Sequence, residues 1–452
     1  MHLIGNGKDF PGQVFVLLFA LRNVKRHIRR SFLTFFLVLF SSFLITALRF
    51  MAYGMHQEML KNAVSLSSGF LQIAAHGWLE NRSIERSLDA PPGFLSSLKV
   101  PGVQAVSPRI TGYALAAHGQ ESAIISVFAA NHAQEEKITN IHAYPIKGAF
   151  LQALPGDRGK TREGYTIFNV VIGRTLANNL EAKLGSEISL VTGQFDGSVG
   201  AVLGRVVGIL KIHDLEIAGA RAYISLAGGR ELFGLHTRAD GLERYTNIAL
   251  GVSDYLAAKR VHDVLIKKFP PPVLKPNETP QDSTNYAPVM HLWKDLIPGL
   301  VQLLEFDDIQ NNASWAFLIM VMAIGILITV QMSIQERNRE FAVMMAIGAE
   351  HYYIIRLILT ETLLIFLPGI ILGGLIGTGV GYYMQENPIA LPSEVTDAYA
   401  SMGMQALSIS AIVNFEQLWI ALASLFFPSI FLTLLATRRI FKINPAEAIV
   451  TY

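Results

Sequence analysis

Cysteine is absent from this chain of 452 residues. Its absence excludes disulfide bonds, thiolate metal sites and cysteine nucleophiles. The 12 histidines are scattered, without a His-Glu-x-x-His pattern or a tight cluster of ligands, so we predict no metal site. The carboxylates also lack a constellation suited to acid–base pairing. From these absences we predict that the chain has no catalytic residues of its own.

Charge is also scarce. Only 16% of the residues are charged and 51% are hydrophobic, which is too apolar for an ordinary soluble protein. The apolar excess lies in four uncharged runs, at residues 31–48, 309–335, 362–385 and 417–437. Each run is long enough to cross a hydrocarbon core about 30 Å thick as a helix. The sequence therefore predicts a membrane protein with four transmembrane α-helices.

A long polar insert separates the first run from the second. Short β-rich stretches dominate its first part, at residues 103–106, 122–128, 169–172, 187–191, 201–210, 222–225 and 247–252. Helical patterns occupy residues 174–184 and 253–268. A leucine repeat over 292–304 predicts a helix that runs into the second span, with a bend expected at Pro298. This mixture predicts a large α+β extracytoplasmic domain inserted between transmembrane helices 1 and 2.

Lysine and arginine are distributed unevenly around the spans. Six of them lie in residues 1–31, whereas residues 386–416 have none. Because short basic loops stay cytoplasmic, we predict a multi-pass membrane protein with both termini inside. The predicted segments are a cytoplasmic amphipathic helix (1–30), helix 1 (31–54), the extracytoplasmic domain with stalk extensions (55–308), helix 2 (309–335), a cytoplasmic loop (336–361), helix 3 (362–385), an extracytoplasmic loop (386–416), helix 4 (417–437) and a cytoplasmic tail (438–452).

No segment of the sequence satisfies the pattern of a phosphate-binding loop. Gly159-Lys160-Thr161 imitates the end of that pattern, but Leu154 stands where a glycine is required. The residues that follow do not begin an apolar helix whose N-terminus could face phosphate. We interpret the segment as a surface loop and predict no cofactor in this chain. Any ATP must therefore be hydrolysed by another polypeptide.

The third run is unusually rich in glycine. Gly369, Gly373, Gly377 and Gly381 are spaced four residues apart, and two further glycines lie among them. In water, six glycines would cost a helix roughly 6 kcal/mol relative to alanine. A stripe of glycines at this spacing lets another backbone approach closely. We predict a helix–helix seam, within the subunit or across a dimer, and treat sliding along that seam as a hypothesis.

The segment after the second run begins with dense charge and continues with apolar residues. Phe341, Met344, Met345 and Gly348 fall on one face of a helix. One interpretation is a basic, solvated inner loop. The other is a short helix that inserts into a groove on a partner protein, with the apolar face around Gly348 as the docking face.

The same segment carries a family resemblance. Residues 339–349, with Arg356 and Glu361 downstream, resemble the cytoplasmic loop of the MacB, LolC/LolE and FtsX group of ABC permeases. Further stretches resemble the same group along nearly the whole chain, namely residues 20–24, 172–177, 184–188, 206–209 and 443–448. The chain resembles most the lipoprotein-releasing LolC/LolE type, because residues 69–73 and 196–200 also look like that branch.

The resemblance implies a coupling helix at residues 335–350 that sits on a cytoplasmic ABC ATPase subunit, which binds ATP and Mg. The residues implied in this coupling are Glu336, Arg337, Arg339, Glu340, Phe341, Met344, Met345, Gly348 and Ala349. It also implies a place in the bacterial inner (cytoplasmic) membrane. The implied partners are a second permease copy or paralogue, membrane lipids and a lipoprotein or periplasmic protein, with no nucleic acid. The expected function is ATP-driven release of lipoproteins or other hydrophobic cargo. The alternative is an FtsX-like regulator of a periplasmic enzyme that transports nothing.

Overall fold

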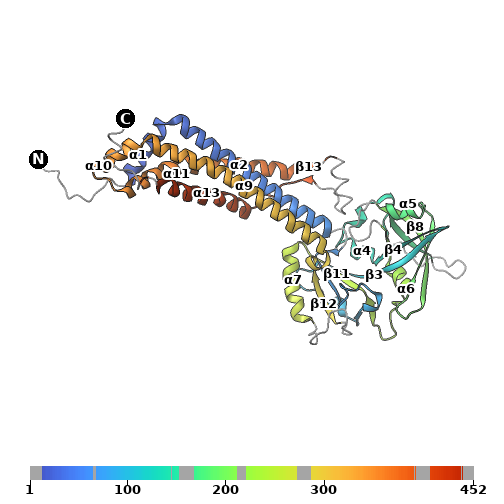
Figure 1. Cartoon of the computed structure of the whole chain (residues 1–452). Helices are drawn as coiled ribbons and strands as arrows, with labels where there is room; N and C mark the ends of the chain where they lie inside the picture. Colours follow the sequence, from blue (N-terminus) through green and yellow to red (C-terminus); the bar gives the residue numbers. More distant parts are fainter. Residues whose placement is uncertain are drawn as a thin grey trace. The chain divides into compact units, whose positions relative to one another are not determined.

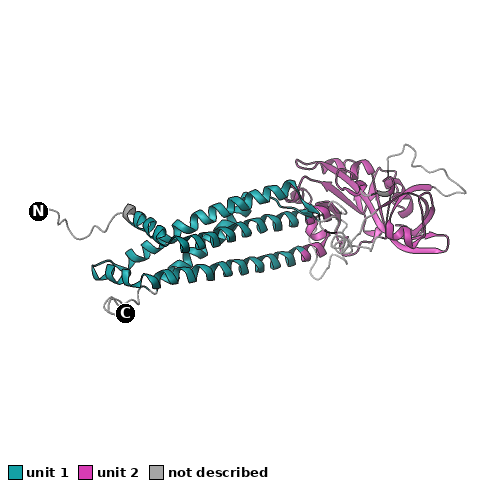
Figure 2. Ribbon diagram, turned by 90° about the horizontal axis from the view of Figure 1, so that it is seen from above, with its two compact units in different colours: residues 1–58, 304–390, 408–452 teal, residues 59–303, 391–407 magenta. Residues whose placement is uncertain are grey.

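A computed structural model describes residues 13–64, 68–143, 145–151, 167–210, 220–271, 287–390, 392, 408–438 and 440. The chain divides into two compact units (Figures 1 and 2). Unit 1 comprises residues 1–58, 304–390 and 408–452, and unit 2 comprises residues 59–303 and 391–407. Parts of the segments named above lie outside the described residues: 1–12, Leu154 with 159–161, most of the 386–416 loop, and the tail beyond 440 with its 443–448 stretch.

Unit 1 is a bundle of helices. Its elements are α1 (Gln13–Arg26), α2 (Ile28–Ala63), α9 (Pro298–Glu336), α10 (Asn338–Ala346), α11 (His351–Glu386), α13 (Phe415–Thr437) and a small hairpin of β13 (Ile389–Ala390) and β14 (Ser408–Ile409). The last turn of α2 and the first turns of α9 extend into unit 2. Within unit 1, α1 and α10 lie at one end of the bundle and β13 lies at the other (Figure 1).

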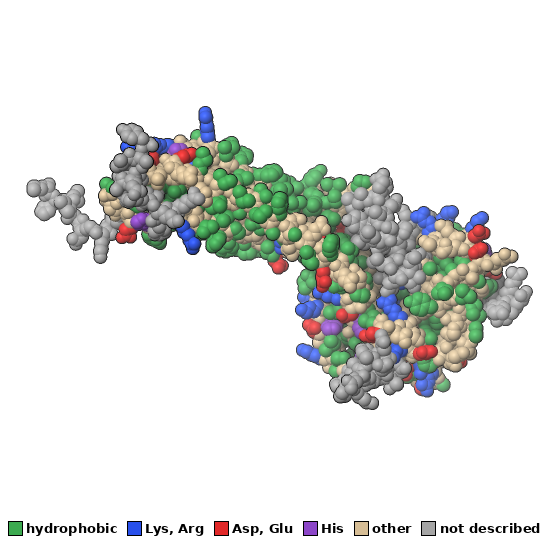
Figure 3. Space-filling view, viewed as in Figure 1, with side chains coloured by type: hydrophobic (Ala, Val, Ile, Leu, Met, Phe, Trp, Pro, Cys, Tyr) green, Lys and Arg blue, Asp and Glu red, His purple; other side chains and the backbone are tan. Residues whose placement is uncertain are grey.

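Four of these helices, α2, α9, α11 and α13, are long and apolar enough to cross a membrane. Each presents large apolar side chains outward: Leu33 is 71% exposed on α2, Ile324 51% on α9, Leu375 63% on α11 and Phe427 66% on α13. Apolar side chains cover the visible face of the bundle, and charged ones gather at the end with α1 and α10 (Figure 3). An apolar surface of this extent is typical of lipid contact.

The glycine stripe of α11 packs against α2 of the same chain. A Cβ on Gly373 would lie 2.3 Å from the carbonyl oxygen of Leu39, and one on Gly377 would lie 2.8 Å from the Cβ of Thr46. Gly369 and Gly381 meet Val38 and Phe50 of α2 in the same way. The close approach lets the Ser42 hydroxyl donate a 2.8 Å hydrogen bond to the carbonyl of Ile370. The predicted seam therefore lies within the subunit.

Unit 2 is built on a mixed sheet. The strands of unit 2 are β1 (Leu71–Ala75), β2 (Leu88–Ala90), β3 (Ala105–His118), β4 (Glu121–Ala130), β5 (Pro145–Gly148), β6 (Ile167–Gly173), β7 (Glu187–Gly193), β8 (Val199–Leu210), β9 (Arg221–Ser225), β10 (Glu243–Tyr245), β11 (Asn247–Gly251) and β12 (Pro288–Leu292). All belong to the mixed sheet except β2 and β10, which pair with each other in a separate two-stranded sheet. The pairings β3–β4–β9–β6–β8–β7 return to β3, so these six strands form a closed ring. The first half of β3 also pairs with β11, which leads on to β1 and then β12.

Short helices connect the strands of unit 2: η2 (Ile84–Arg86), α3 (Phe94–Ser97), α4 (His132–Glu135), η3 (Ile141–Ala143), α5 (Arg174–Asn179), α6 (Leu226–Phe233), α7 (Tyr255–Lys268) and α8 (Trp293–Leu296). The main core is a large cluster of buried side chains to which β3, β4, β6, β8 and β11 contribute. A second, smaller cluster includes Phe128, Val171 and Tyr223. The predicted fold class is confirmed: the α+β domain is inserted between the first two long helices.

Several predicted elements have other bounds. The helix predicted over 174–184 ends at Asn179, because Glu181 adopts a left-handed backbone with φ 51°. The helix predicted over 292–304 runs into the second span as α9, but its start is a separate element, α8. Ile297 between them leaves the helical region (φ −131°, ψ 68°). A residue before proline is disfavoured in the helical region, so Pro298 begins α9 instead of bending a longer helix.

Candidate ATPase-coupling site

The charged segment after α9 folds into a separate short helix, the nine-residue α10. Arg337 leaves the helical region (φ −106°, ψ 11°) and so separates α10 from α9. At the other end Gly348 has φ +100°, and its amide donates to the carbonyl of Met345 while that of Ala349 donates to Met344. This left-handed ending favours glycine. The chain then turns into α11.

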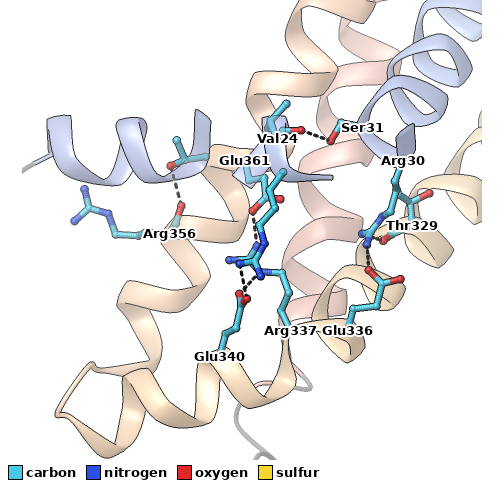
Figure 4. Close-up of polar contacts among 11 residues, drawn as sticks. Val24, Arg30, Ser31, Thr329, Glu336, Arg337, Glu340, Arg356 and Glu361 are labelled. Carbon is cyan, nitrogen blue, oxygen red and sulfur yellow. Dashed lines mark hydrogen bonds and ion pairs between the residues drawn. The ribbon is translucent and has the colours of Figure 1, made fainter. Parts of the chain in front are cut away.

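A buried arginine joins α10 to α11. The Arg337 side chain is 3% exposed, and its guanidinium donates to Glu340 at 3.0 Å and to Glu361 at 2.7 Å (Figure 4). Its Cζ also lies 4.9 Å from the centre of the Phe341 ring. A buried charge is stable only when it is paired, so these contacts fix the angle between the two helices.

Two further ion pairs tie the N-terminal helices to the same end. Arg26 of α1 lies 3.0 Å from Glu340. Arg30 of α2 lies 2.8 Å from Glu336 (Figure 4). Arg30 also donates to the carbonyl of Thr329 on α9 at 2.6 Å. Exposed pairs contribute little singly. Together with the buried Arg337, however, they connect α1, α2, α9, α10 and α11 into one charged joint.

Phe341, which sequence reasoning placed on the docking face, does not lie on the accessible side of α10. Phe341 is fully buried in the core of the bundle, and Met344 and Met345 are only partly accessible and pack against the same core. The physical reason is that the joint at Arg337 turns this side of α10 toward α11 and its neighbours. The opposite side carries the accessible apolar residues, with Val343 46% exposed and Ile347 81% exposed.

The exposed surface of α10 continues into a groove beside α1. The groove has a volume of about 510 Å³. Its lining combines apolar and mostly basic residues: Phe19, Arg22, Asn23, Arg26, Arg339, Glu340, Val343 and Met344. This surface, which we call the α10 face, consists of the groove together with Ile347. The spacing of Val343 and Ile347, four residues apart on a helix, is the signal that sequence reasoning missed.

The sequence-predicted residues therefore divide into four sets. Arg337, Glu340 and Glu336 hold the joint, and Phe341 belongs to the bundle core. Gly348 and Ala349 end the helix. Arg339 is exposed on the α10 face. Among the described residues, no group of His, Asp and Glu is placed to hold a metal ion.

Two family models cover most of the chain. Residues 312–445 match the FtsX-like permease C-terminal model, and residues 31–265, more than half of the chain, match the MacB-like periplasmic core domain. The chain belongs to the MacB/FtsX-like family of ABC transporter permeases. It is therefore a multi-pass membrane protein, and in this family the permease is a subunit whose ATPase activity resides in a separate subunit.

Individual relatives of this permease are distant. An uncharacterized ABC transporter permease of Methanocaldococcus jannaschii is 23% identical over 96% of this chain and 97% of its own length. The lipoprotein-releasing system transmembrane protein LolC of Neisseria meningitidis is 20% identical over 77% of this chain and 78% of its own. The crystal structure of the periplasmic region of MacB from Actinobacillus actinomycetemcomitans covers 54% of this chain and 98% of its own, with 14% identity and a TM-score of 0.32.

Proposed function

We propose that this permease docks through the α10 face on a separate cytoplasmic ATPase subunit and passes nucleotide-driven movement to unit 2. In this arrangement α10 and both termini lie on the cytoplasmic side of the inner membrane, and unit 2 lies outside. Two permease chains, identical or paralogous, and two ATPase subunits form the working complex. The ATPase supplies the chemistry, and this chain supplies the mechanical connection.

The observation that carries the proposal is the exposure of Ile347 and Val343 at the tip of a charged joint. An isoleucine that is 81% exposed is unfavourable in water unless a partner covers it. Behind it, the buried Arg337 ties α10 to α11 at 2.7 Å. A push on Ile347 is therefore resisted by α11 and by the helices that share the joint, and cannot be absorbed by α10 alone.

The cargo that we propose is a lipoprotein or another hydrophobic molecule released from the outer leaflet of the inner membrane. The LolC relative supports this choice, because its match extends over 77% of this chain and includes both domains. Crosslinking of the full chain in membranes tests it. Recovery of lipid-linked cargo supports release, whereas recovery of a periplasmic hydrolase alone would favour the FtsX-like regulatory alternative.

The docking proposal is tested by changing the α10 face. The full chain carrying Ile347→Asp is purified from membranes with an affinity tag, and the co-purifying ATPase and its ATP hydrolysis are measured. We expect at least a tenfold loss of bound ATPase, because truncation of an interface hot spot costs about 2 kcal/mol or more. The control is Ile389→Asp, which changes a 54% exposed isoleucine in β13, at the other end of unit 1.

Ile389→Asp should retain the ATPase, and both variants should insert into membranes normally. Full retention of ATPase binding and turnover by Ile347→Asp would defeat the docking proposal.

A further inference from the structure

The N-terminal helix α1 has an exposed side that the proposed function does not use. On one side of α1, Val16 and Ala20 are buried against α11. The side away from α11 carries Leu18, Leu21 and Lys25, which are spaced three and four residues apart and therefore share one face of the helix. We call these three residues the α1 face. None of them lines the groove of the α10 face.

The apolar part of the α1 face is continuous with the apolar surface of the bundle. Leu18 is 53% exposed and Leu21 is 41% exposed, which is unfavourable in water. His27 is the single residue between α1 and α2, and the first turns of α2 again present exposed apolar side chains, Ile28 and Phe32. Because α2 is long and apolar enough to cross a membrane, this continuity favours the bilayer as the occupant of the α1 face.

The contact with α11 places α1 at the edge of the hydrocarbon core. The apolar cluster that α1 forms with α11 extends from Tyr353 to Leu364. Tyr353 precedes the uncharged run 362–385, whereas Leu364 belongs to it. Since that run crosses the hydrocarbon core, α1 lies beside its beginning, at the level of the lipid headgroups.

Two basic residues border the apolar part of this surface. Lys25 and Arg29 are exposed, and neither forms an ion pair within the part of the chain that the structure describes. Arg26 and Arg30, by contrast, are each paired with a glutamate of the joint. The aliphatic part of a lysine or arginine side chain can lie on an apolar surface while its charge reaches the headgroups. Lys25 and Arg29 therefore favour headgroups of opposite charge.

We propose that the α1 face, together with Arg29, binds anionic phospholipids of the surrounding bilayer. Its leucines lie among the upper parts of the acyl chains, and Lys25 and Arg29 contact the phosphate groups. These lipids hold α1 against α11, and α1 is in turn paired with α10 through Arg26 and Glu340 at 3.0 Å. The anionic lipid therefore acts on the joint through α1. The proposal requires only that unit 1 crosses a bilayer, and it does not depend on an ATPase.

The test compares two lipids at one labelled position. Because the chain has no cysteine, Leu18→Cys in the full chain accepts a single fluorophore, and the protein is placed in nanodiscs of phosphatidylcholine and phosphatidylglycerol. Each lipid is supplied in turn with a nitroxide near the top of one acyl chain, and the quenching gives the relative binding of the two lipids beside α1. Phe427→Cys, at an exposed position of α13, reports the same ratio elsewhere on the bundle.

We expect the phosphatidylglycerol nitroxide to quench the Leu18→Cys label more strongly than the phosphatidylcholine nitroxide, and both to quench the Phe427→Cys label equally. Lys25→Gln and Arg29→Gln should each lower the preference about fivefold, because a basic residue near an anionic surface contributes about 1 kcal/mol. The matched controls, Lys25→Arg and Arg29→Lys, retain the charge and should retain the preference.

Equal quenching of the Leu18→Cys label by the two lipids, or the same preference at Phe427→Cys, would overturn the proposal. So would a preference that both glutamine variants leave unchanged. Quenching by neither lipid would show that a protein segment covers the α1 face instead. Lys25 and Arg29 are exposed, so their variants should fold. No ATPase takes part, so this result and the docking result for Ile347→Asp are independent.

Discussion

Because α2 and α11 pack closely along the glycine stripe, we predict that adding a single methyl group to α11 at Gly373 destabilises the protein. In Gly373→Ala the new Cβ would lie 2.3 Å from the carbonyl oxygen of Leu39 and 2.7 Å from the Cβ of Ser42. These neighbours cannot rotate away, because the first is backbone and the second is the root of a side chain. The two helices must therefore separate, and the hydrogen bond from Ser42 to Ile370 must lengthen.

The magnitude follows from a comparison within the same helix. Gly379 is also helical, but a Cβ there meets nothing within 4 Å. Both substitutions gain about 1 kcal/mol of helix propensity, so this gain cancels between them. Overpacking of a closely packed site costs about 1–3 kcal/mol. We therefore expect Gly373→Ala to be less stable than Gly379→Ala by about 1–3 kcal/mol.

The assay is unfolding of the purified chain in mixed micelles by titration with sodium dodecyl sulfate, followed by circular dichroism. Gly377→Ala, whose Cβ would lie 2.8 Å from that of Thr46, should behave like Gly373→Ala. The reasoning is refuted if Gly373→Ala and Gly379→Ala unfold at the same detergent fraction.

Two further predictions concern unit 2. Glu135→Gln should lower the free energy of unfolding by about 3–5 kcal/mol, because Arg109 would stay buried without its counter-charge. Thermal unfolding measures this loss, and Glu187→Gln, which breaks an exposed pair, should cost about 1 kcal/mol or less; equal losses would contradict the argument. Burial lowers the pKa of His291, so the unfolded chain takes up a proton there before the folded chain does. The contribution of neutral His291 to the free energy of unfolding should be fully present above pH about 6.5 and should fall as the pH drops below it. His291→Gln should flatten this dependence, and a wild-type melting temperature that is constant from about pH 7 to 5 would argue against it.

The sequence reveals most of the fold where local patterns decide the structure. The four uncharged runs identify the four long helices, and the alternating stretches identify β4, β8 and β11 to within a few residues. The prediction for β3 covered only its start, since Pro108 and Arg109 do not belong in an ordinary strand. Arg109 is stable there only because Glu135, 26 residues further along the chain, neutralises it. Local patterns do not contain that pairing.

The candidate site shows the same division. The charged residues that precede an apolar stretch predict the short helix, and Gly348 predicts where that helix ends. The direction in which α10 faces does not follow, because it depends on the contact of Arg337 with Glu361, 24 residues away in the chain. The glycine spacing predicted a seam but could not identify α2 as the helix that fills it.

The two helices that continue into unit 2 differ from the other two spans in one respect. With 36 and 39 residues, α2 and α9 are about 54 and 58 Å long. Neither has a proline beyond its first residue, whereas α11 and α13 contain Pro368 and Pro428. Proline is a common cause of kinks. α2 and α9 lack this cause of a kink, so we expect each to move as one continuous helix without a hinge at a proline.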